Sequence, residues 1–533
     1  MKNLLSLVLA SMISVVSSAG SIYYVSPDGA DDAACTYDNP GSISAALALA
    51  SPADSWEDGD TIIFKDGKYP FPSTRDKYAY TVDKAFLTLR SESNSPERTM
   101  LVGGYTNAPG MGFNITGPAF IEGLAFTNFA SWKSGIVLNC KASDAGGVTV
   151  SNCMFVNNLG YTYSSFKSRY GTAVGGAYYD CSFMNNTNDA YSQGGAGIIS
   201  GVAVNCKFLH NYSNQGAALI NTSATNCFFY GNKSTYTGAS GGAAYFTTTG
   251  KLYRCSFIAN YASGTGGAVS ASGDVFAENC DFICNTNSKP GGAAIAGVST
   301  LNCRFEGNEG SSRGGIISGG SHTNAIAVGN IGYQGLFSGE FYDCYFGTNT
   351  GYYIFTDFKG YRCHIDSNSS QYSTFSSGGP LINCLITTNI MSKDREFCNL
   401  TSINCTYVGN VPNFSYGAMS GGVSTNCIFW GSNKNDLTGG THTAAYYGKA
   451  STAAIVTNQC VVLTEAPFVY DGNPDAPYTP KLKSPVVNSG IPVDSDVLLE
   501  KDFYGRGRIR NGVIDVGCAE RYPRYLPSVM KVR

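Results

Sequence analysis

The sequence predicts an all-β solenoid, and three observations support this fold class. The chain of 533 residues contains 64 Gly and 35 Tyr but only 14% charged residues, a composition typical of turn-rich β proteins. A short motif of Cys, an aromatic residue and Asn recurs along most of the chain. Its copies lie 19 to 28 residues apart, except for one gap of 41, and a period in the low twenties indicates stacked coils.

The motif places a large apolar residue two positions after Cys and Asn five positions after Cys. The Cys positions are Cys153, Cys181, Cys206, Cys227, Cys255, Cys280, Cys303, Cys344, Cys363, Cys384, Cys405 and Cys427. The matching Asn positions are Asn158, Asn186, Asn211, Asn232, Asn260, Asn285, Asn308, Asn349, Asn368, Asn389 and Asn410, with Ser432 as the one departure. The long gap between Cys303 and Cys344 has room for two coils.

The spacing within the motif indicates a strand followed by a bend. Residues two apart lie on one face of a strand, so Cys and the aromatic residue are expected to fill the inside of each coil. Asn tolerates left-handed backbone, and stacked Asn side chains can form a hydrogen-bonded ladder from coil to coil. Cys in neighbouring coils would be close enough for disulfides, but their parallel side chains favour buried thiols, and no Cys and His spacing suggests zinc.

A second mark, Gly-Gly-Ala, precedes Cys by about half a coil in several repeats. Examples are Gly175-Gly176-Ala177, Gly241-Gly242-Ala243 and Gly266-Gly267-Ala268. Glycine permits positive φ and close approach of backbones, so we interpret this mark as a second bend that leads into another short strand. The core would then lie between two or three parallel strand faces.

The two ends of the chain differ from the repeat. Residues 1–19 read as a signal peptide with cleavage after Ala19, and residues 20–59 as an N-terminal cap with an apolar helix pattern from Gly41. Coils are expected over 60–432 and an irregular C-terminal β cap over 433–533. Within that cap, Asp502, Arg506, Arg508 and Asp515 allow an ion site, although structural salt bridges are favoured.

Charge and hydropathy limit the partners. A net charge of −3 gives no basic footprint for nucleic acid or for an anionic membrane surface. No second apolar segment of spanning length follows the signal peptide, so no transmembrane segment is expected in the mature chain. The sequence therefore predicts a protein that is secreted or held at the outer cell surface.

These motifs resemble the right-handed parallel β-helix, or pectin-lyase-like, superfamily. The repeats Gly266-Gly267-Ala268 and Phe257 to Asn260 resemble those of chlamydial polymorphic outer-membrane proteins, which are surface adhesins. The opening YYVSPDGADD from Tyr23 and the closing SPVVNSG with IDVGCAE are similar to secreted bacterial β-helix proteins of the choice-of-anchor type. The resemblance implies the fold and a bacterial source, whereas the superfamily contains lyases, hydrolases and adhesins.

Weak catalytic candidates follow from register between adjacent coils. Polysaccharide lyases of this superfamily generally use acidic residues that hold Ca²⁺ and an Arg or Lys base, so Ca²⁺ is possible if the chain is a lyase; otherwise no cofactor or metal is expected. Neighbouring outward positions bring Asp281 beside Arg304, with Glu306 on the same strand and Arg313 in the following loop. An ordinary cross-strand salt bridge explains the same residues, and both interpretations stay open.

Tyrosines suggest a binding function. Tyr161, Tyr163 and Tyr170 lie in one loop and Tyr352 and Tyr353 at a coil edge, where aromatic rings could stack on sugars or simply cover the coils. The favoured hypothesis is a non-catalytic β-helix protein that binds an extracellular polysaccharide or the surface of a host or neighbouring cell. The alternatives are a polysaccharide lyase or glycoside hydrolase, and a structural rod that assembles into filaments.

Overall fold

The structure is a computed structural model that describes residues 20–74, 77–104, 110–131, 135–140, 147–161, 171–189, 194–311, 314–393, 397–413, 416–451, 455–468, 476–494, 500–509 and 512–521. The chain divides into two compact units, Met1–Leu209 and His210–Arg533, and each is described by itself. The predicted signal peptide lies outside the described residues.

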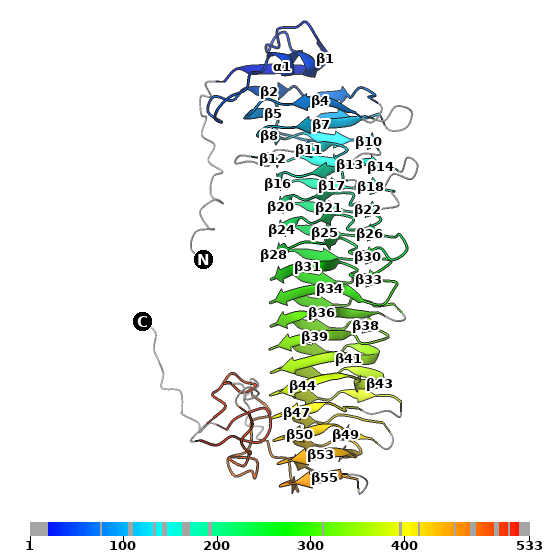
Figure 1. Ribbon diagram of the computed structural model, residues 1–533, viewed down its shortest axis with the longest axis vertical. Coiled ribbons are helices and arrows are strands. Elements are labelled where there is room, and N and C mark those ends of the chain that lie inside the picture. The colour runs from blue at the N-terminus through cyan, green and yellow to red at the C-terminus, as the bar shows by residue number, and fades with distance from the viewer. Residues whose placement is uncertain are drawn as a thin grey trace. The chain divides into compact units, whose positions relative to one another are not determined.

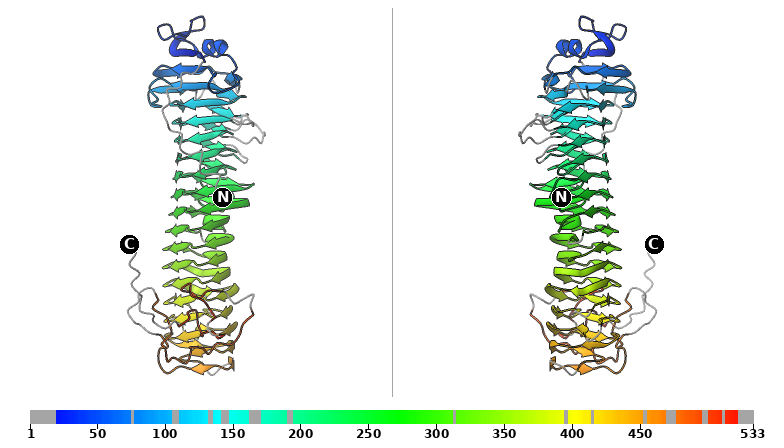
Figure 2. Two further views of the ribbon diagram at one scale, coloured as in Figure 1. Left: turned by 90° about the vertical axis from the view of Figure 1, so that its left-hand side faces the viewer. Right: turned by 90° about the vertical axis from the view of Figure 1, so that its right-hand side faces the viewer.

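In both units, parallel strands stack rung upon rung, as Figure 1 and Figure 2 show for each unit. Three kinds of strand make up a coil. The motif sheet contains the strand that follows each motif Cys, the broad sheet contains the longest strands, and the narrow strands are mostly two residues long. This arrangement confirms the predicted parallel β-helix.

In the first unit, the motif sheet comprises β3 (Gly67–Pro70), β6 (Thr99–Val102), β9 (Ala125–Thr127), β13 (Met154–Val156), β17 (Ser182–Met184) and β21 (Lys207–Leu209). The broad sheet comprises β1 (Ile22–Ala30), β2 (Thr61–Phe64), β4 (Tyr78–Val82), β5 (Leu87–Ser91), β7 (Met111–Ile115), β8 (Ala119–Glu122), β11 (Leu138–Cys140), β12 (Val148–Ser151), β15 (Ala173–Val174), β16 (Ala177–Tyr179), β19 (Ile198–Ile199) and β20 (Val202–Val204). The narrow strands are β10 (Ala130–Ser131), β14 (Leu159–Gly160) and β18 (Thr187–Asn188).

In the second unit, the motif sheet comprises β25 (Phe228–Tyr230), β29 (Ser256–Ile258), β32 (Asp281–Ile283), β35 (Arg304–Glu306), β37 (Ile326–Val328), β40 (Tyr345–Gly347), β42 (His364–Asp366), β45 (Leu385–Thr387), β48 (Thr406–Val408), β51 (Ile428–Trp430), β54 (Tyr446–Tyr447) and β56 (Val461–Val462). The broad sheet comprises β23 (Leu219–Ile220), β24 (Ser223–Thr225), β27 (Ala244–Phe246), β28 (Gly250–Tyr253), β31 (Val269–Glu278), β34 (Gly292–Leu301), β36 (Gly315–Thr323), β39 (Phe337–Tyr342), β41 (Thr350–Tyr361), β44 (Gly378–Ile382), β47 (Thr401–Ile403), β50 (Val423–Thr425), β53 (Gly440–Thr443) and β55 (Ile455–Asn458).

The remaining narrow strands of the second unit are β22 (Tyr212–Ser213), β26 (Lys233–Ser234), β30 (Tyr261–Ala262), β33 (Thr286–Asn287), β38 (Ile331–Gly332), β43 (Ser369–Phe375), β46 (Ile390–Met391), β49 (Gly417–Met419) and β52 (Asn435–Leu437).

The N-terminal cap contains the one described helix, α1 (Ile43–Leu49), where the sequence predicted it. The Ser42 side chain accepts a hydrogen bond from the Ala45 amide at 3.0 Å, which caps the first turn. The helix residues Ile43, Ala45 and Ala46 are buried. The parallel pairing starts before the predicted coil boundary at residue 60, because β1 pairs with β2.

The interior is built as the motif predicts. Consecutive motif phenylalanines stack face to face, for example Phe229 on Phe257 at 4.5 Å and Phe257 on Phe282 at 5.1 Å between ring centroids. These rings are fully buried. The stacked rings form the apolar centre of each coil, where large side chains contribute most to stability.

The motif Asn residues form the predicted ladder. In the second unit each ladder Asn donates its backbone amide and side-chain amide to the Oδ1 atom of the next one, at 2.9–3.1 Å. Its side chain also donates to a motif-sheet carbonyl, as Asn308 does to Phe282 at 2.8 Å. The ladder runs through Asn330, which supplies the second coil expected in the long Cys303–Cys344 gap.

The left-handed backbone lies at other positions than the ladder Asn. Positive φ occurs at the residue just before the ladder Asn, such as Asn157 (57°), and at the residue before the motif Cys, such as Asn279 (54°). None of the described ladder Asn residues has a positive φ, so the prediction of left-handed backbone at the ladder Asn is wrong. Its inward side chain turns the corner by hydrogen bonding, while its neighbour supplies the backbone bend.

The Gly-Gly-Ala mark is a bend, as predicted. Gly266 has φ +66°, a conformation that favours glycine. A Cβ atom at Gly267 would lie 2.1 Å from the Ala293 carbonyl oxygen of the next coil. The first glycine therefore permits the turn and the second permits close approach of two coils.

The coils extend beyond the predicted boundary at Ser432. Strands β53 to β56 continue the parallel pairing as far as Val462. Here Ala445 replaces the motif Cys and Tyr447 pairs with Phe429, so the coil persists although its motif has changed. A search for Cys and Asn alone ends too early because Ala fits the same inward position.

The chain that follows the last coil, here called the C-terminal segment, lies beside the last coils (Figure 1). Its packing contacts place it on the outer face of the motif sheet. Val486 and Val516 pack on Ile428 and Tyr446, and Cys518 and Ala519 pack on Leu385. Among the described residues of this segment, strand pairing is limited to isolated antiparallel bridges, Phe468 with Pro480 and Lys501 with Gly507, so the described part is irregular as predicted.

Salt bridges occur within this segment, as we predicted from the sequence. Arg506 pairs with Asp502 at 2.9 Å, and the fully buried Arg508 pairs with Glu520 at 3.0 Å. Asp515 accepts the Asn488 amide at 2.7 Å. Two of the four predicted residues thus pair with each other, and Arg508 finds a carboxylate that the sequence did not single out.

All eighteen cysteines carry free thiols, and all but Cys284 and Cys460 are buried. Motif thiols donate to backbone carbonyls, as Cys303 does to Leu301 at 3.4 Å and to Ala277 at 3.5 Å. Burial raises the pKa of Cys398 to about 11 and that of Cys140 to about 12. Since the thiolate is the reactive form, these cysteines are expected to be inert.

We therefore expect a thiol reagent such as DTNB to modify the native protein rapidly at one site, Cys284, and slowly at Cys460. All eighteen thiols should react after denaturation. The Cys284→Ser variant should abolish the rapid phase. Rapid modification of several thiols in the native Cys284→Ser protein would contradict the buried ladder.

Candidate functional site

The predicted acidic and basic residues share the outward face of the motif sheet. Asp281 on β32 lies in register with Arg304 on β35, as expected. The ion pair of Arg304, however, is formed with Glu306 of its own strand. Both side chains are well exposed, 49% for Arg304 and 40% for Glu306, so this pair is a solvated surface contact. Arg313 lies outside the described residues.

The described residues contain no group of three or more His, Cys, Asp or Glu side chains arranged to hold a metal ion. Two of the four histidines are internal. His322 contacts the Thr300 hydroxyl at 2.9 Å and the Gly319 carbonyl at 3.0 Å, while His442 makes the same kind of contacts with Ser424 and Gly439. These two side chains belong to the core.

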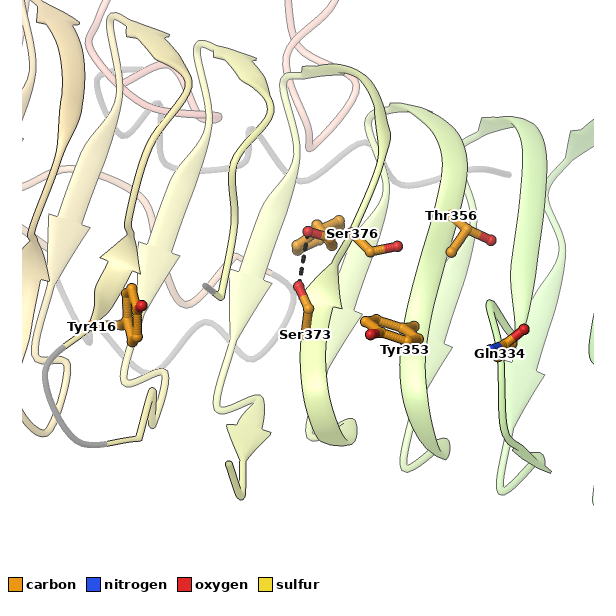
Figure 3. Close-up of a pocket in the computed structure, with 7 residues that line it drawn as sticks. Gln334, Tyr353, Thr356, Ser373, Ser376 and Tyr416 are labelled. Atoms are coloured by element: carbon orange, nitrogen blue, oxygen red, sulfur yellow. Dashed lines mark hydrogen bonds between the residues drawn. The ribbon is translucent and has the colours of Figure 1, made fainter. Parts of the chain in front are cut away.

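A cavity of about 540 Å³ opens where β41 and β43 bend. Its lining residues are Gln334, Tyr353, Thr356, Ser373, Phe375, Ser376 and Tyr416. Figure 3 shows the labelled side chains spread over successive coils. Since one of the predicted binding residues, Tyr353, lines this cavity, we call it the aromatic groove.

The strand register explains the groove. Tyr353 of β41 pairs with Ser373 of β43, and Phe355 pairs with Phe375 two residues on. The Ser373 hydroxyl donates to the Phe375 carbonyl at 3.0 Å (Figure 3). A small Ser beside a large Tyr leaves the depression, and the buried Phe375 contributes an apolar floor.

Tyrosines of three successive coils continue the aromatic surface beside the groove. The Tyr333 and Tyr352 rings meet edge to face at 4.9 Å, and Tyr352 and Tyr372 do so at 5.3 Å. Tyr353 stacks on Tyr372 at 5.8 Å with an interplanar angle of 23°. Tyr333 and Tyr352 remain 39% and 36% exposed, so their rings are accessible to a ligand.

A lysine extends the same row. Lys393 Nζ lies 4.7 Å from the centre of the Tyr372 ring and donates to its hydroxyl at 3.3 Å. Cation–π contact and hydrogen bond together hold this tyrosine in place. The row Tyr333, Tyr352, Tyr372, Lys393 therefore presents rings first and a positive charge last.

The groove offers neutral hydrogen-bonding groups. Gln334 can donate and accept, and Thr356, Ser376 and Tyr416 supply hydroxyls. The seven described lining residues include neither a carboxylate nor a histidine, so proton transfer by an ordinary acid or base has no candidate among them. The lining is chemically suited to binding a neutral, hydroxyl-rich ligand.

The structure describes one of the other three predicted tyrosines, Tyr161. Tyr161 belongs to the first unit, where it is half-buried and its amide donates to the Ser131 carbonyl at 3.1 Å. Tyr163 and Tyr170 lie outside the described residues. Of the three predicted binding tyrosines that the structure describes, Tyr352 and Tyr353 lie together at the groove.

Sequence reasoning missed Tyr333, Tyr372, Lys393 and Tyr416. A signal for the first two existed, because Tyr333, Tyr352 and Tyr372 are spaced by 19 and 20 residues, close to the local coil length. Residues at that spacing occupy equivalent places on neighbouring coils. Tyr416 carries no such periodic signal.

Comparisons with known proteins support no specific activity. No family model matches the chain, and no curated protein matches it. Solved structures that it resembles include a pectate lyase (13% identity, 94% of this chain and 96% of that chain, TM-score 0.21), an alginate lyase bound to a trisaccharide (13%, 83% and 84%, 0.27) and a surface adhesin of Streptococcus pneumoniae (9%, 69% and 84%, 0.25). The class of the protein, a parallel β-helix, rests on its own strand pairing.

Proposed function

We propose that this chain is a secreted or cell-surface protein that binds glycan through the aromatic groove, without chemical change at that groove. The carrying observation is the accessible row of Tyr333, Tyr352 and Tyr372 beside a cavity with a polar lining. The ligand would be an extracellular polysaccharide or the glycan surface of a host or neighbouring cell.

The geometry of the row supports an extended ligand. Neighbouring coils are separated by about 4.8 Å, so three tyrosines present rings along roughly 10 Å of surface. Aromatic faces bind the apolar faces of sugar rings, while the groove hydroxyls and Gln334 can hydrogen-bond to sugar hydroxyls. The low charge of the chain is compatible with a neutral ligand.

At the groove and at the predicted catalytic trio, binding is favoured over cleavage of the polysaccharide chain for two reasons. The described lining residues of the groove have no acid or base, and the predicted catalytic trio is reduced to a solvated Arg304–Glu306 pair beside Asp281.

Among the described residues, no helix is long and apolar enough to cross a membrane. Secretion and surface location remain part of the proposal.

The test is binding of the mature chain to a panel of neutral and acidic polysaccharides, measured by affinity electrophoresis and calorimetry. An aromatic contact contributes about 0.5–1.5 kcal/mol, so the double variant Tyr352→Ala/Tyr372→Ala should weaken binding about tenfold or more. Polysaccharide chain length should be unchanged after incubation.

Tyr236→Ala is the matched control, because Tyr236 is also exposed (46%) but lies on another coil. It should leave affinity unchanged. Equal affinity of the double variant and the control would remove the groove as the binding site. Absence of any retained polysaccharide on the panel would reject glycan binding altogether.

A further inference from the structure

A second group of polar side chains lies on the outward face of the motif sheet, away from the residues that line the groove. Strands β40, β42 and β45 bring two columns into register: Tyr345, His364 and Leu385 in one, and Gly347, Asp366 and Thr387 in the other. Tyr345, His364 and Asp366 thus meet although they come from successive coils. None of them was a predicted site residue.

Gly347 makes room for this arrangement. A Cβ atom at Gly347 would lie 2.5 Å from the Tyr345 hydroxyl and 2.7 Å from its ring, so the tyrosine lies across the glycine. This position brings the phenol toward Asp366, the register partner of Gly347. Burial and the Asp366 carboxylate both raise the pKa of Tyr345. Any larger residue at position 347 would displace the phenol.

Hydrogen bonding fixes the protonation pattern of His364. The Thr387 hydroxyl donates to Asp366 Oδ1 at 2.6 Å, and the Thr388 hydroxyl donates to the same atom at 2.7 Å. Because the Thr387 hydroxyl already donates its one hydrogen to Asp366, its oxygen acts as the acceptor for His364 Nε2, at 3.0 Å. Neutral His364 therefore carries its proton on Nε2 and has a lone pair on Nδ1. Nδ1 has no hydrogen-bond partner among the described residues, and it is not buried, so solvent can reach this lone pair.

The C-terminal segment forms a wall beside this group. The Phe503 ring contacts the His364 ring edge to face at 5.8 Å, and Tyr345 contacts it from the other coil at 5.3 Å. The next residue in the column, Leu385, is already buried under the segment. His364 therefore stands in the corner where the open sheet face meets the wall.

We infer that His364 is the general base of a hydrolytic site for O-acyl esters of sugars, with Thr387 and Asp366 as positioning residues. Nδ1 accepts a proton from water as the water oxygen adds to the acyl carbon. The C–O bond to the sugar then breaks, and the proton on Nδ1 passes to the departing sugar oxygen, giving a free acid and a free hydroxyl. Thr387 is buried, so water is the nucleophile.

Spacing argues against the other two reactions of glycans. Glycosidases need two carboxyl groups within about 10 Å, but Glu306 is three coils from Asp366 in the same column, about 14 Å. Elimination from an acidic sugar needs a cation beside the sugar carboxylate. The predicted Arg304 is equally three coils from His364, and Arg362, two residues before His364, is already paired with Asp343 at 2.6 and 2.7 Å. Ester hydrolysis requires neither.

The choice of a sugar ester rests on the proposed glycan binding, whereas the base itself does not. The first probe is therefore 4-nitrophenyl acetate, and the second is acetate release from O-acetylated xylan. The wild-type chain should hydrolyse both, and His364→Gln should lower the rates at least about a hundredfold. His210→Gln is the matched control, because His210 is an exposed histidine on another coil, and it should leave the rates unchanged.

The variant Asp366→Asn tests the positioning role of Asp366. The groups that face His364 are Asp366 on its own strand, Tyr345 on β40 and, beside Asp366, Tyr478 of the C-terminal segment. Burial lowers the pKa of His364, and Asp366 partly opposes this. Loss of the charge should therefore move the inflection of the pH–rate profile to lower pH and lower the plateau rate, whereas a merely structural role would not move the inflection.

Two results would overturn the inference: equal rates for wild type and His364→Gln, or an NMR spectrum of folded wild-type protein in which neutral His364 carries its proton on Nδ1. The second measurement needs no variant to fold. Retention of polysaccharide reports on the groove, whereas hydrolysis of 4-nitrophenyl acetate reports on the ester site, so failure of glycan binding and failure of the ester site are distinguishable.

Discussion

Asn308→Ala is expected to lower the free energy of unfolding of the second unit by about 3–5 kcal/mol, because several buried groups lose partners at once. Asn308 Oδ1 accepts both the backbone and side-chain amides of Asn285, at 2.9 and 3.0 Å. Its own side chain donates to Phe282 and Asn330. Denaturant unfolding monitored by circular dichroism measures the loss, and hydrogen exchange locates it to the coils on either side.

Asn302→Gly is the control for this prediction. Asn302 also bonds to another Asn, donating to Asn279 at 3.2 Å, but it does so at the surface and with φ 54°, which glycine adopts freely. Its replacement should cost less than about 1 kcal/mol. If the two variants lose equal stability, the internal ladder has no special role in holding the coils together.

Arg508→Met is expected to destabilise the C-terminal segment by about 3–5 kcal/mol, because the partner of a buried carboxyl is removed. Arg508 Nη2 also donates to the Gly517 carbonyl at 2.6 Å and the Asp515 carbonyl at 3.2 Å. Hydrogen exchange over 476–494 and 500–521 should accelerate. Leu385 and Ile428 should become accessible as the segment loosens.

The size of this effect should depend on pH. Burial raises the pKa of Glu520 to about 8, although the charge of Arg508 opposes the rise. When the pKa of a carboxyl group is higher in the folded protein than in the unfolded chain, the folded protein loses stability as the pH rises from the unfolded pKa to the folded pKa. Without Arg508 the folded pKa rises further, so Arg508→Met should cost more at pH 9 than at pH 6.

Lys481→Met is the matched control for Arg508→Met. Its ion pair with Glu465 is exposed, with 39% and 81% of the side chains accessible, so its loss should cost less than about 1 kcal/mol at either pH. The double variant Arg508→Met/Glu520→Leu should recover part of the stability lost in Arg508→Met. A single variant as stable as the wild type at pH 9 would contradict the prediction.

Most of the fold could be predicted because each coil repeats one local pattern. Inward residues such as Phe257 and Phe282 and ladder residues such as Asn285 are fixed by the same requirement in every coil, and repetition makes that requirement visible. The last coils escaped notice because Ala445 and Tyr447 meet the requirement with other residue types. The repeat shows which residue types are usual at the inward positions, but other residue types can also occupy those positions.

The candidate sites could be predicted only in part, because they depend on outward positions. Tyr352 and Tyr353 were identified from local clustering, but Tyr372 joins them only through the coil stacking. The contact of His364 with Phe503 joins residues 139 positions apart, from a coil and from an irregular segment. Periodicity in the coils gives no information about where such a segment packs.

The register of the motif sheet also has an evolutionary consequence. Along one column the outward residue changes from Asp281 to Arg304, Ile326, Tyr345 and His364, while the inward neighbours remain apolar. Selection can therefore rewrite the outer surface one coil at a time without disturbing the interior. The sheet is a scaffold on which a new activity can arise at one coil while an older one is retained at another.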